Sequence, residues 1–320
     1  MNEIQKRMYE IGIIPVIAME DANLAVPLAN ALVKGGIPAA EVTFRTAAGE
    51  EAIRQMAQNC PEILVGAGTI LNVEQAQRAI NAGAKFIVSP GFIQEVIDFC
   101  QEQNVPIFPG CVNASDMTRA CNSGLEIVKF FPAEASGGLA MIKNLAPVFP
   151  KLKFMPTGGV STKNLLSYLS YDRIIGCGGT WMVKKDLIEG QKWDEITAIC
   201  QEAVKVMLGF HVKHVGINAA DKDDAEKTAK LLCGLFGFEY RESTDSFFAG
   251  EGIECMKGKF RGTMGHIGIA TNNVDRAIAK LAADGVEFEE ESRRTDAKGN
   301  TKSIYLKGEY CGFALHLMQA

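Results

Sequence analysis

The sequence predicts an α/β protein of two domains, a (β/α)8 TIM barrel over residues 1–208 and an α+β domain of two βαβββ modules over residues 212–320. Three observations lead to this prediction. The 320 residues exceed what one ordinary core accommodates. Up to about residue 208, eight short apolar runs alternate with helical patterns, as in a barrel of parallel strands. After His211, a pattern of strand, helix and further strands occurs twice.

The composition restricts the class of protein before any motif is considered. Hydrophobic residues make up 47% and charged residues 22%, which is typical of a soluble globular chain. The net charge of −5 argues against a nucleic-acid partner, and no apolar run is long enough to cross a membrane. Met1–Glu10 lacks the apolar core of a signal peptide. The nine cysteines are dispersed without a Cys-x-x-Cys pair, so we expect reduced thiols and a cytoplasmic location.

Eight segments of the first domain are predicted to be strands because each is short, apolar and bounded by turn residues. They are Ile13–Ala18, Ala39–Phe44, Ile63–Gly66, Lys85–Ser89, Val105–Pro109, Leu125–Phe131, Leu152–Pro156 and Arg173–Cys177. Amphipathic stretches with helical spacing lie between them, including Asn23–Lys34, Ala48–Asn59, Val73–Ala82, Gln94–Gln103 and Ser115–Ser123. A doubly wound open sheet shows the same alternation and is the structural alternative. Trp193–Leu208 is predicted to close the domain as a helix, with Gly209 as its stop.

One lysine stands inside the apolar run that Pro132 ends. Lys129 is near the C-terminal end of this predicted strand, where burial disfavours the ammonium form. A neutral amine is a nucleophile that attacks a ketone to give a Schiff base. The alternative is a structural lysine whose head group reaches the barrel rim. This strand by itself leaves both interpretations open.

The ends of the other strands supply groups that complement this lysine, because the active site of a (β/α)8 barrel lies at the C-terminal ends of its strands. Glu41 is predicted to point into the barrel mouth, where a carboxylate beside a Schiff-base lysine can transfer protons. Its alternative is a surface ion pair with Arg45. The pairs Gly158-Gly159 and Gly178-Gly179 follow the seventh and eighth strands, the usual position of a phosphate site in this fold.

At these positions the sequence resembles the KDPG/KHG aldolases, class I enzymes that cleave 2-keto-3-deoxy-6-phosphogluconate (KDPG) and 4-hydroxy-2-oxoglutarate (KHG). The resemblance covers roughly residues 3–207 and rests on five motifs in combination. These are Glu-Val-Thr-x-Arg-Thr at 41–46, Gly-Ala-Gly-Thr at 66–69, Ser-Pro-Gly at 89–91, Lys-Phe-Phe-Pro-Ala-Glu at 129–134 and Pro-Thr-Gly-Gly-Val at 156–160. Phe44 and Thr180 depart from the family pattern, which more often has an aliphatic residue and a serine there.

The resemblance implies a metal-free and cofactor-free lyase that acts on a small-molecule substrate and assembles as a homotrimer. By position, Lys129 is the Schiff-base lysine and Glu41 the general acid and base. The residues implied to contact the substrate are Arg45, Thr69, Pro90, Phe131 and Thr157, and those implied to bind its phosphate are Gly158, Gly159, Gly179 and Thr180. A catalytically silent sensor of keto acids or sugar phosphates is the alternative function. Binding alone needs neither a nucleophilic lysine nor a carboxylate beside it, which favours the enzyme.

The second domain contains a weak internal repeat. His214-Val-Gly-Ile recurs as His266-Ile-Gly-Ile, and each copy continues with a helical pattern and ends in a predicted strand. This order resembles the vicinal-oxygen-chelate superfamily, to which glyoxalase I and antibiotic-resistance proteins belong. The resemblance implies that the first and last strands of each copy carry the ligands of one divalent metal, and Zn, Ni, Mn and Fe suit such a set. The implied ligands are His214, Glu254, His266 and His316.

His316 departs from that superfamily, which usually has glutamate at this position. Three of the chain's four histidines nevertheless fall at the implied ligand positions. The alternative is a scaffold without metal, in which these are inward-facing strand residues of a small-molecule binding module.

Overall fold

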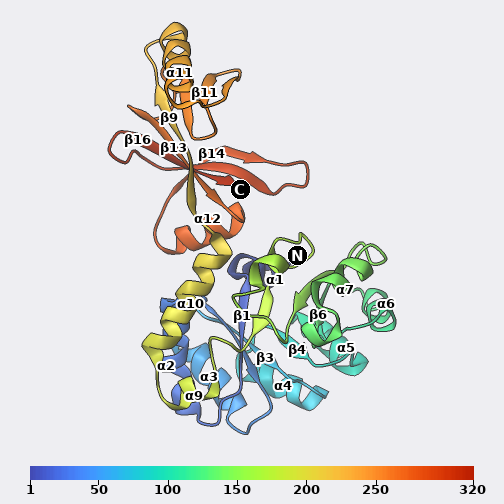
Figure 1. Ribbon diagram of the computed structural model, residues 1–320. Helices are drawn as coiled ribbons and strands as arrows, with labels where there is room; N and C mark the ends of the chain where they lie inside the picture. The colour runs from blue at the N-terminus through green and yellow to red at the C-terminus, as the bar shows by residue number, and fades with distance from the viewer. The chain divides into compact units, whose positions relative to one another are not determined.

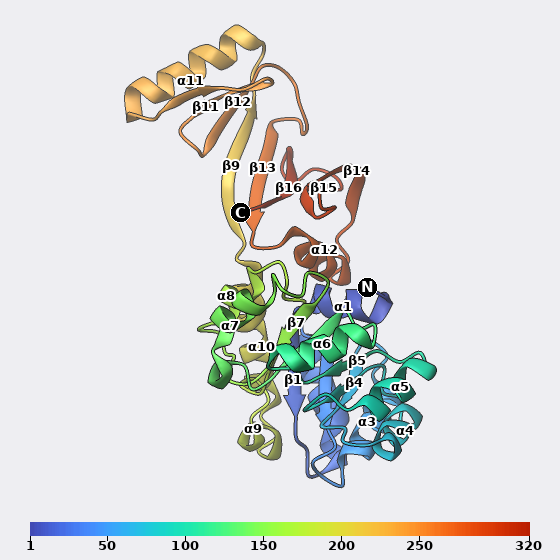
Figure 2. The same ribbon diagram turned by 90° about the vertical axis from the view of Figure 1, so that its right-hand side faces the viewer.

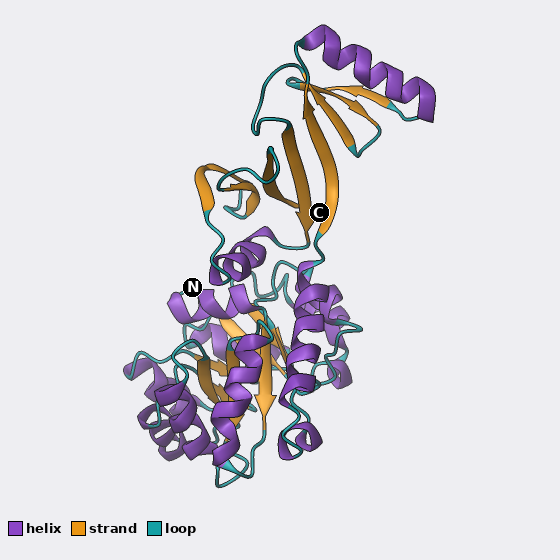
Figure 3. Cartoon of the chain, turned by 90° about the vertical axis from the view of Figure 1, so that its left-hand side faces the viewer, coloured by secondary structure: helices purple, strands orange, loops and turns teal.

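The computed structural model describes residues 1–320, and the chain divides into two compact units, Met1–Met207 and Leu208–Ala320. The first unit is an α/β barrel and the second is built mainly of β-strands (Figures 1 and 3). No helix in either unit has the length and apolar character needed to span a membrane.

The first unit is organised around eight short parallel strands. Six of them form a sheet in the order β5-β4-β3-β2-β1-β8, and β6 pairs with β7. Single bridges between Gly110 and Lys129 and between Thr157 and Gly178 join the two groups into a ring, so the open doubly wound sheet is wrong. The strands are β1 Ile13–Ile17, β2 Ala39–Thr43, β3 Leu64–Gly68, β4 Ile87–Ser89, β5 Ile107–Pro109, β6 Ile127–Phe130, β7 Lys153–Pro156 and β8 Cys177–Gly179.

Helices surround these strands (Figure 3). Several begin at an asparagine whose side chain caps the first turn; Asn72 accepts from the Gln75 amide, and Asn113 from the Asp116 amide. The helices are α1 Glu3–Ile11, α2 Ala25–Lys34, α3 Gly49–Asn59, α4 Val73–Asn81, α5 Gln94–Glu102, α6 Ala114–Asn122, α7 Gly138–Leu145, α8 Leu165–Leu169, α9 Lys185–Glu189 and α10 Trp193–Leu208, with 3₁₀ turns η1 Ala22–Leu24 and η2 Glu134–Ser136. Nearly every strand residue is buried, because the barrel interior covers one face and the helices the other.

The eighth strand differs from its prediction. It spans Cys177–Gly179, whereas the apolar run predicted a strand ending at Cys177. Pairing with β1 starts only where Ile13 lies opposite Cys177. Before that point the chain makes a single bridge to β7, and the Arg173 guanidinium donates to the carbonyls of Phe149 and Leu152. Apolar character therefore marked the buried segment but not the part that is hydrogen-bonded as a strand.

The second unit is one eight-stranded sheet in the order β10-β11-β12-β9-β13-β16-β15-β14. Its two central strands, β9 and β13, are antiparallel, and each has a parallel neighbour in β12 and β16 respectively. Helix α11 packs on β11 and β12 (Figure 2), over a small core that includes Ala225, Ala229, Phe247 and Cys255. The elements are β9 His211–Asn218, α11 Lys222–Phe236, β10 Tyr240–Glu242, β11 Ser246–Ala249, β12 Ile253–Met256, β13 Gly265–Thr271, α12 Val274–Ala283, β14 Phe288–Thr295, β15 Thr301–Leu306 and β16 Phe313–Gln319.

Candidate active site

The centre of the barrel holds a buried ion pair between β6 and β2. The Nζ of Lys129 lies 3.1 Å from Oε1 of Glu41, although the two residues are 88 positions apart. Lys129 is 6% exposed and Glu41 is fully buried. Removing two charges from water costs free energy that their mutual attraction often does not recover, so a buried ion pair is a poor stabiliser of the fold. Buried ionisable groups with a specific charged partner are concentrated at functional sites, which favours a catalytic role for this pair. The structure thus brings together the two residues that the sequence predicted to be catalytic.

Glycines create the space that these side chains occupy. A Cβ atom at Gly68 of β3 would lie 2.4 Å from Glu41 Oε1, so only glycine fits beside this carboxylate. A Cβ atom at Gly178 would lie 2.2 Å from the Thr157 hydroxyl oxygen. Both Glu41 Oε2 and Thr157 Oγ1 are buried and have no hydrogen-bond partner within the chain. These two oxygens are available to a substrate or to a water molecule.

The loop after β3 carries unusual backbone geometry. Thr69 adopts a φ of +59°, a conformation that costs energy for a β-branched residue and is concentrated at functional sites. In the loop after β2, Arg45 Nε donates to Thr43 Oγ1 over 3.2 Å, and that hydroxyl donates in turn to the Ile17 carbonyl. The side chain of the exposed Arg45 is therefore oriented by Thr43 of β2, which is itself held by Ile17 of β1. An oriented guanidinium suits recognition of a carboxylate.

The remaining predicted substrate contacts lie at other strand ends. Phe131 follows β6, and its ring centroid is 5.2 Å from Lys129 Nζ, within cation–π range. Pro90 follows β4 in a turn that Ser89 holds by donating to the Gly91 carbonyl over 2.8 Å. Phe131 is 38% exposed, so one of its faces is open to an incoming molecule.

The loops after β7 and β8 present free backbone donors. Gly158 and Gly159 have φ angles of +98° and +82°, which curve the chain into a turn of the kind that binds anions. The amides of Gly158, Gly159 and Thr180 donate to no acceptor within the chain, and Gly179 is the last residue of β8. Three of the four predicted phosphate residues thus lie in these two loops and Gly179 ends β8, at the place where this fold binds phosphate.

A tyrosine and a glutamate support this turn. The Tyr168 hydroxyl donates to Glu134 Oε1, and burial, together with this hydrogen bond, raises the pKa of Tyr168. The Glu134 amide donates to the Gly158 carbonyl over 3.1 Å, and a Cβ atom at Gly159 would lie 2.5 Å from Glu134 Cγ. Glu134 therefore packs directly on the turn that carries the free amides.

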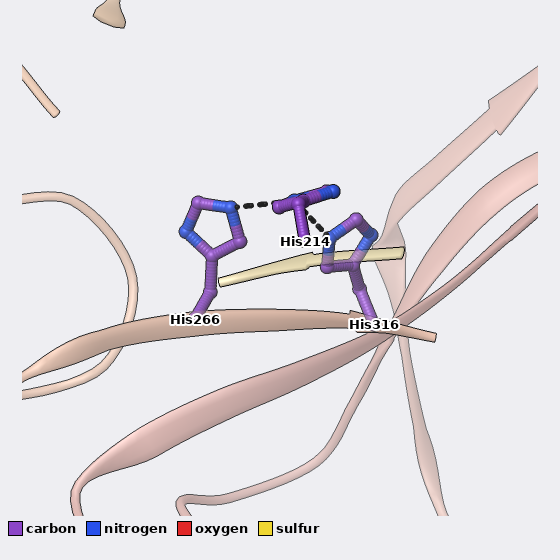
Figure 4. Close-up of side chains that lie close together, drawn as sticks. All are labelled: His214, His266 and His316. Carbon is purple, nitrogen blue, oxygen red and sulfur yellow. Dashed lines mark hydrogen bonds between the residues drawn. The ribbon is translucent and has the colours of Figure 1, made fainter. Parts of the chain in front are cut away.

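A second cluster lies on one face of the sheet in the second unit. His214 Nε2 is 3.1 Å from His266 Nε2 and 3.3 Å from His316 Nε2 (Figure 4). Glu254 Oε2 lies 3.1 Å from His266 Nε2 and 3.5 Å from His214 Nε2. The three histidine nitrogens lie within 4.8 Å of one another, and the carboxylate oxygen contacts two of them. These are the four residues that the superfamily resemblance implied.

The strand register explains this convergence. In the antiparallel pairing of β9 with β13, His266 lies opposite Gly216 and His214 lies opposite Gly268. A Cβ atom at Gly216 would lie 2.1 Å from His266 Cε1, and one at Gly268 would lie 2.4 Å from His214 Cε1. In each His-x-Gly copy, the histidine thus provides an imidazole ring, and the glycine leaves the space that the imidazole ring of the other copy occupies. Glu254 and His316 flank the same two glycines from the outer strands.

The environment of His214, His316 and Glu254 favours the protonation states that bind metal. Burial, reinforced by repulsion from His214 and His266, lowers the pKa of His316 to about 3. Burial also lowers the pKa of His214, although Glu254 opposes it. Burial alone would raise the pKa of Glu254, but hydrogen bonds from His266 and Ser246 outweigh it and hold that pKa below its usual value. Neutral imidazoles beside an ionised carboxylate are ready to ligate a cation without releasing protons.

Several contributing residues were not predicted from the sequence. Gly68 was predicted only as part of the Gly-Ala-Gly-Thr motif, with no role of its own, and Ser246, whose hydroxyl donates to Glu254 over 2.6 Å, was not predicted. The signal for Gly216 and Gly268 was present, because a glycine follows each repeated histidine by two residues. Its meaning depends on which strand lies opposite, and the sequence does not state this.

Comparisons with known proteins match the first unit. The sequence pattern of the family described as KDPG and KHG aldolase matches residues 4–199. The chain is 44% identical over 207 residues to a 2-dehydro-3-deoxy-phosphogluconate aldolase of Treponema pallidum, which covers 65% of this chain and 99% of the relative. It is 40% identical over 193 residues to the KHG/KDPG aldolase of Escherichia coli K12, covering 60% of this chain and 91% of the relative.

A solved structure shows a similar barrel. It is a KDPG aldolase from Legionella pneumophila with pyruvate captured as a covalent carbinolamine, 36% identical, with a TM-score of 0.60. The match covers 62% of this chain and 97% of that one. The family match ends at residue 199, before the second unit begins.

Proposed function

Because the chain belongs to the KDPG and KHG aldolase family, and is therefore a carbon–carbon lyase, we propose that its barrel cleaves KDPG and KHG through a Schiff base on Lys129. The observation that carries this proposal is the buried contact of 3.1 Å between Lys129 Nζ and Glu41 Oε1. The products are pyruvate with glyceraldehyde 3-phosphate from the larger substrate, and pyruvate with glyoxylate from the smaller one. A silent sensor is not favoured, because binding does not require this pair.

The proposed mechanism uses side chains of the chain alone. Glu41 takes a proton from the Lys129 ammonium, and the free amine attacks the C2 ketone to give a carbinolamine. Glu41 returns this proton to the carbinolamine hydroxyl, which leaves as water, so that an iminium forms and Glu41 is again a carboxylate. Glu41 then accepts the proton of the C4 hydroxyl while the C3–C4 bond breaks. The bonding electrons move into the iminium, an aldehyde leaves, and an enamine stays on Lys129. Glu41 returns its proton to the enamine carbon, and water releases pyruvate.

We propose places for the other parts of the substrate in the loops that follow the strands. Arg45 and Thr69 are proposed to hold the pyruvyl carboxylate, and Phe131, Pro90 and Thr157 to enclose the reacting carbons. The free amides of Gly158, Gly159 and Thr180, with Gly179, are proposed to hold the phosphate. The homotrimer implied by the family resemblance belongs to the same proposal, and light scattering of the purified chain measures it.

We expect Gly159→Ala to impair cleavage of KDPG far more than cleavage of KHG. The φ of +82° and the Cβ position 2.5 Å from Glu134 Cγ mean that alanine must displace the turn. Only KDPG carries a phosphate, so only KDPG loses contacts when the turn moves. One charged hydrogen bond is worth roughly tenfold or more in binding. Pyruvate release from each substrate measures the effect, and failure of the unmodified chain to release pyruvate from either would overturn the proposed function.

Gly124→Ala is the matched control for this change. Its φ is +73°, and no atom lies within 4 Å of the Cβ position. It therefore adds similar backbone strain away from the site. Equal losses on KDPG and KHG in Gly159→Ala would remove that glycine from the phosphate site.

For the second unit we propose a vicinal-oxygen-chelate type of domain, in which His214, Glu254, His266 and His316 bind one divalent metal. Supporting it, strand, helix and three strands follow one another twice along the chain. Ligands held 2.0–2.1 Å from a tetrahedral metal lie about 3.4 Å apart. Four of the six ligand pairs here, the three that involve His214 and the pair of His266 with Glu254, are separated by 3.1–3.5 Å. A metal bound there would act as a Lewis acid toward an oxygen ligand.

The metal proposal predicts one Zn, Ni, Mn or Fe ion per chain after supplementation, measured by elemental analysis of the desalted protein. His266 Nε2 contacts both His214 and Glu254, so His266→Ala removes a central ligand and stoichiometric binding of the metal should be lost. His211→Ala is the control, because this fourth histidine contacts the Gly209 carbonyl instead of the cluster. Chelator should leave aldolase activity unchanged. A metal-free protein after supplementation with all four ions, or undiminished binding in His266→Ala, would contradict the proposal and favour the binding module.

A further inference from the structure

The histidine cluster forms the floor of a cleft of about 440 Å³ in the second unit. Such a volume is within the range of sites for small metabolites. Phe260 and Tyr305 line its sides, with their rings 5.8 Å and 6.4 Å from that of His266. Aromatic walls around a polar floor are typical of ligand sites, and four protein ligands leave room for further donors on metals that prefer six.

One arginine is held in a fixed position at the wall of this cleft. The guanidinium of Arg261 lies 4.5 Å from the Tyr305 ring centroid, and that ring stacks on His316 at 4.8 Å and 25°. Glu289 forms an ion pair with Arg261 from the side. A guanidinium has five donors, so the ring and a single carboxylate leave several of them available. Because its position is restrained before any ligand arrives, it loses little entropy on binding an anion.

The charged side chains that line the cleft balance one another, because three arginines stand against the three acids Asp245, Glu254 and Glu291. Arg293 lies 2.8 Å from Glu290 and is committed to that pair. Arg294 is exposed and makes no ion pair in the chain, and the acids Asp245 and Glu291 also line the cleft. The cleft therefore becomes positive only when a dication is present on its floor. An anionic ligand should bind to the metal-loaded protein and not to the metal-free one.

From this arrangement we propose that the second unit binds a small 2-oxo acid that carries a second anionic group. This inference rests on the proposed metal site. The adjacent keto and carboxylate oxygens of such an acid can chelate the metal, and the distal anion, carboxylate or phosphate, pairs with Arg261. Tyr305 and Phe260 enclose the carbon chain between the two ends. The aldol cleavage proposed for the barrel releases a 2-oxo acid, so this chemical class occurs where the protein acts.

The test uses the full chain loaded with Co²⁺, whose visible spectrum reports ligands on the metal and is blind to events at Lys129. The probes are 2-oxoglutarate, pyruvate, which lacks the distal anion, glutarate, which lacks the keto group, and 3-phosphonopyruvate, which separates a phosphorus anion from a carboxylate. We expect both dianionic 2-oxo acids, or the one whose distal group fits, to bind more tightly than pyruvate, and glutarate to bind weakest.

Arg261→Met should weaken the dianionic 2-oxo acids about 10- to 100-fold while leaving the Kd for pyruvate within about twofold. Arg261→Lys keeps the positive charge but lacks the planar guanidinium. Its Kd for the dianionic 2-oxo acids should therefore lie between those of the unmodified chain and of Arg261→Met. Arg241→Met is the matched control, since Arg241 also stacks on an aromatic ring, that of Phe248, and lies outside the cleft. Cobalt stoichiometry equal to that of the unmodified protein shows that each variant is folded.

The outcomes separate this inference from the metal proposal. Failure to bind cobalt or any supplemented metal overturns both. Stoichiometric metal with no spectral response to any probe overturns the ligand alone. Equal weakening of pyruvate and the dianionic acids in Arg261→Met, or no weakening of either, removes Arg261 from anion recognition.

Discussion

Borohydride reduction of the full chain in the presence of pyruvate should attach a reduced pyruvyl group to Lys129 and inactivate the enzyme. Lys129 is buried, lies one residue before the end of β6 and contacts Glu41, which can accept its proton. A lysine that becomes a free amine in such a pocket forms an imine, which borohydride converts to a stable secondary amine. Peptide mass mapping locates the label. Labelling at another lysine, or none in an active preparation, would remove Lys129 from the mechanism.

The substitution Lys129→Met should abolish cleavage of KDPG and KHG to the level of the uncatalysed background, because no other group supplies the covalent electron sink. It also leaves Glu41 buried without a cation, and breaking such a pair typically costs about 3–5 kcal/mol of stability. The double variant Lys129→Met/Glu41→Gln removes that unpaired charge and should be the more stable and equally inactive. Lys153→Met, on the neighbouring strand β7, is the control and should retain activity and labelling.

Glu41→Gln should still be labelled by pyruvate and borohydride but should turn over about 10²–10⁴-fold more slowly. The amide has nearly the same shape as the carboxylate and fits the space beside Gly68, so the pocket is preserved. It cannot accept the C4 hydroxyl proton or return a proton to the enamine. The measurement pairs kcat at saturating substrate with the rate of trapping.

The control for this change is Glu126→Gln, just before β6. Glu126 is an exposed partner of the N-terminal amine at 4.0 Å, so its loss should leave kcat unchanged. Near-normal turnover in Glu41→Gln would show that another group carries the proton transfer.

Much of the barrel could be predicted from the sequence, because its strands are buried on both faces and appear as apolar runs between helical patterns. The helix Trp193–Leu208 was predicted with its observed bounds, since its apolar spacing extends to the glycine that ends it. Strand boundaries were less certain. Hydrophobicity reports burial, while a strand is defined by hydrogen bonds to a neighbour, as the late start of β8 at Cys177 illustrates.

The catalytic pair shows how a rule about the fold extends what the sequence contains. Nothing near Lys129 in the sequence indicates Glu41, but both lie on strands of a predicted barrel, and the C-terminal ends of all such strands meet at one mouth. Their contact could therefore be expected. The fit of Gly68 against the carboxylate could not, because it depends on the separation of β2 and β3 in space.

In the second unit the sequence by itself determined which residue types were present and that they recur, His214-x-Gly216 and His266-x-Gly268. Only the tertiary structure decided that each histidine lies opposite the other copy's glycine. It also decided that Arg261, packed on the Tyr305 ring, lines the cleft that contains the histidines. The physical reason is register. A shift of one residue between β9 and β13 would turn one set of rings to the other face of the sheet. Long-range pairing, not local preference, therefore creates this site.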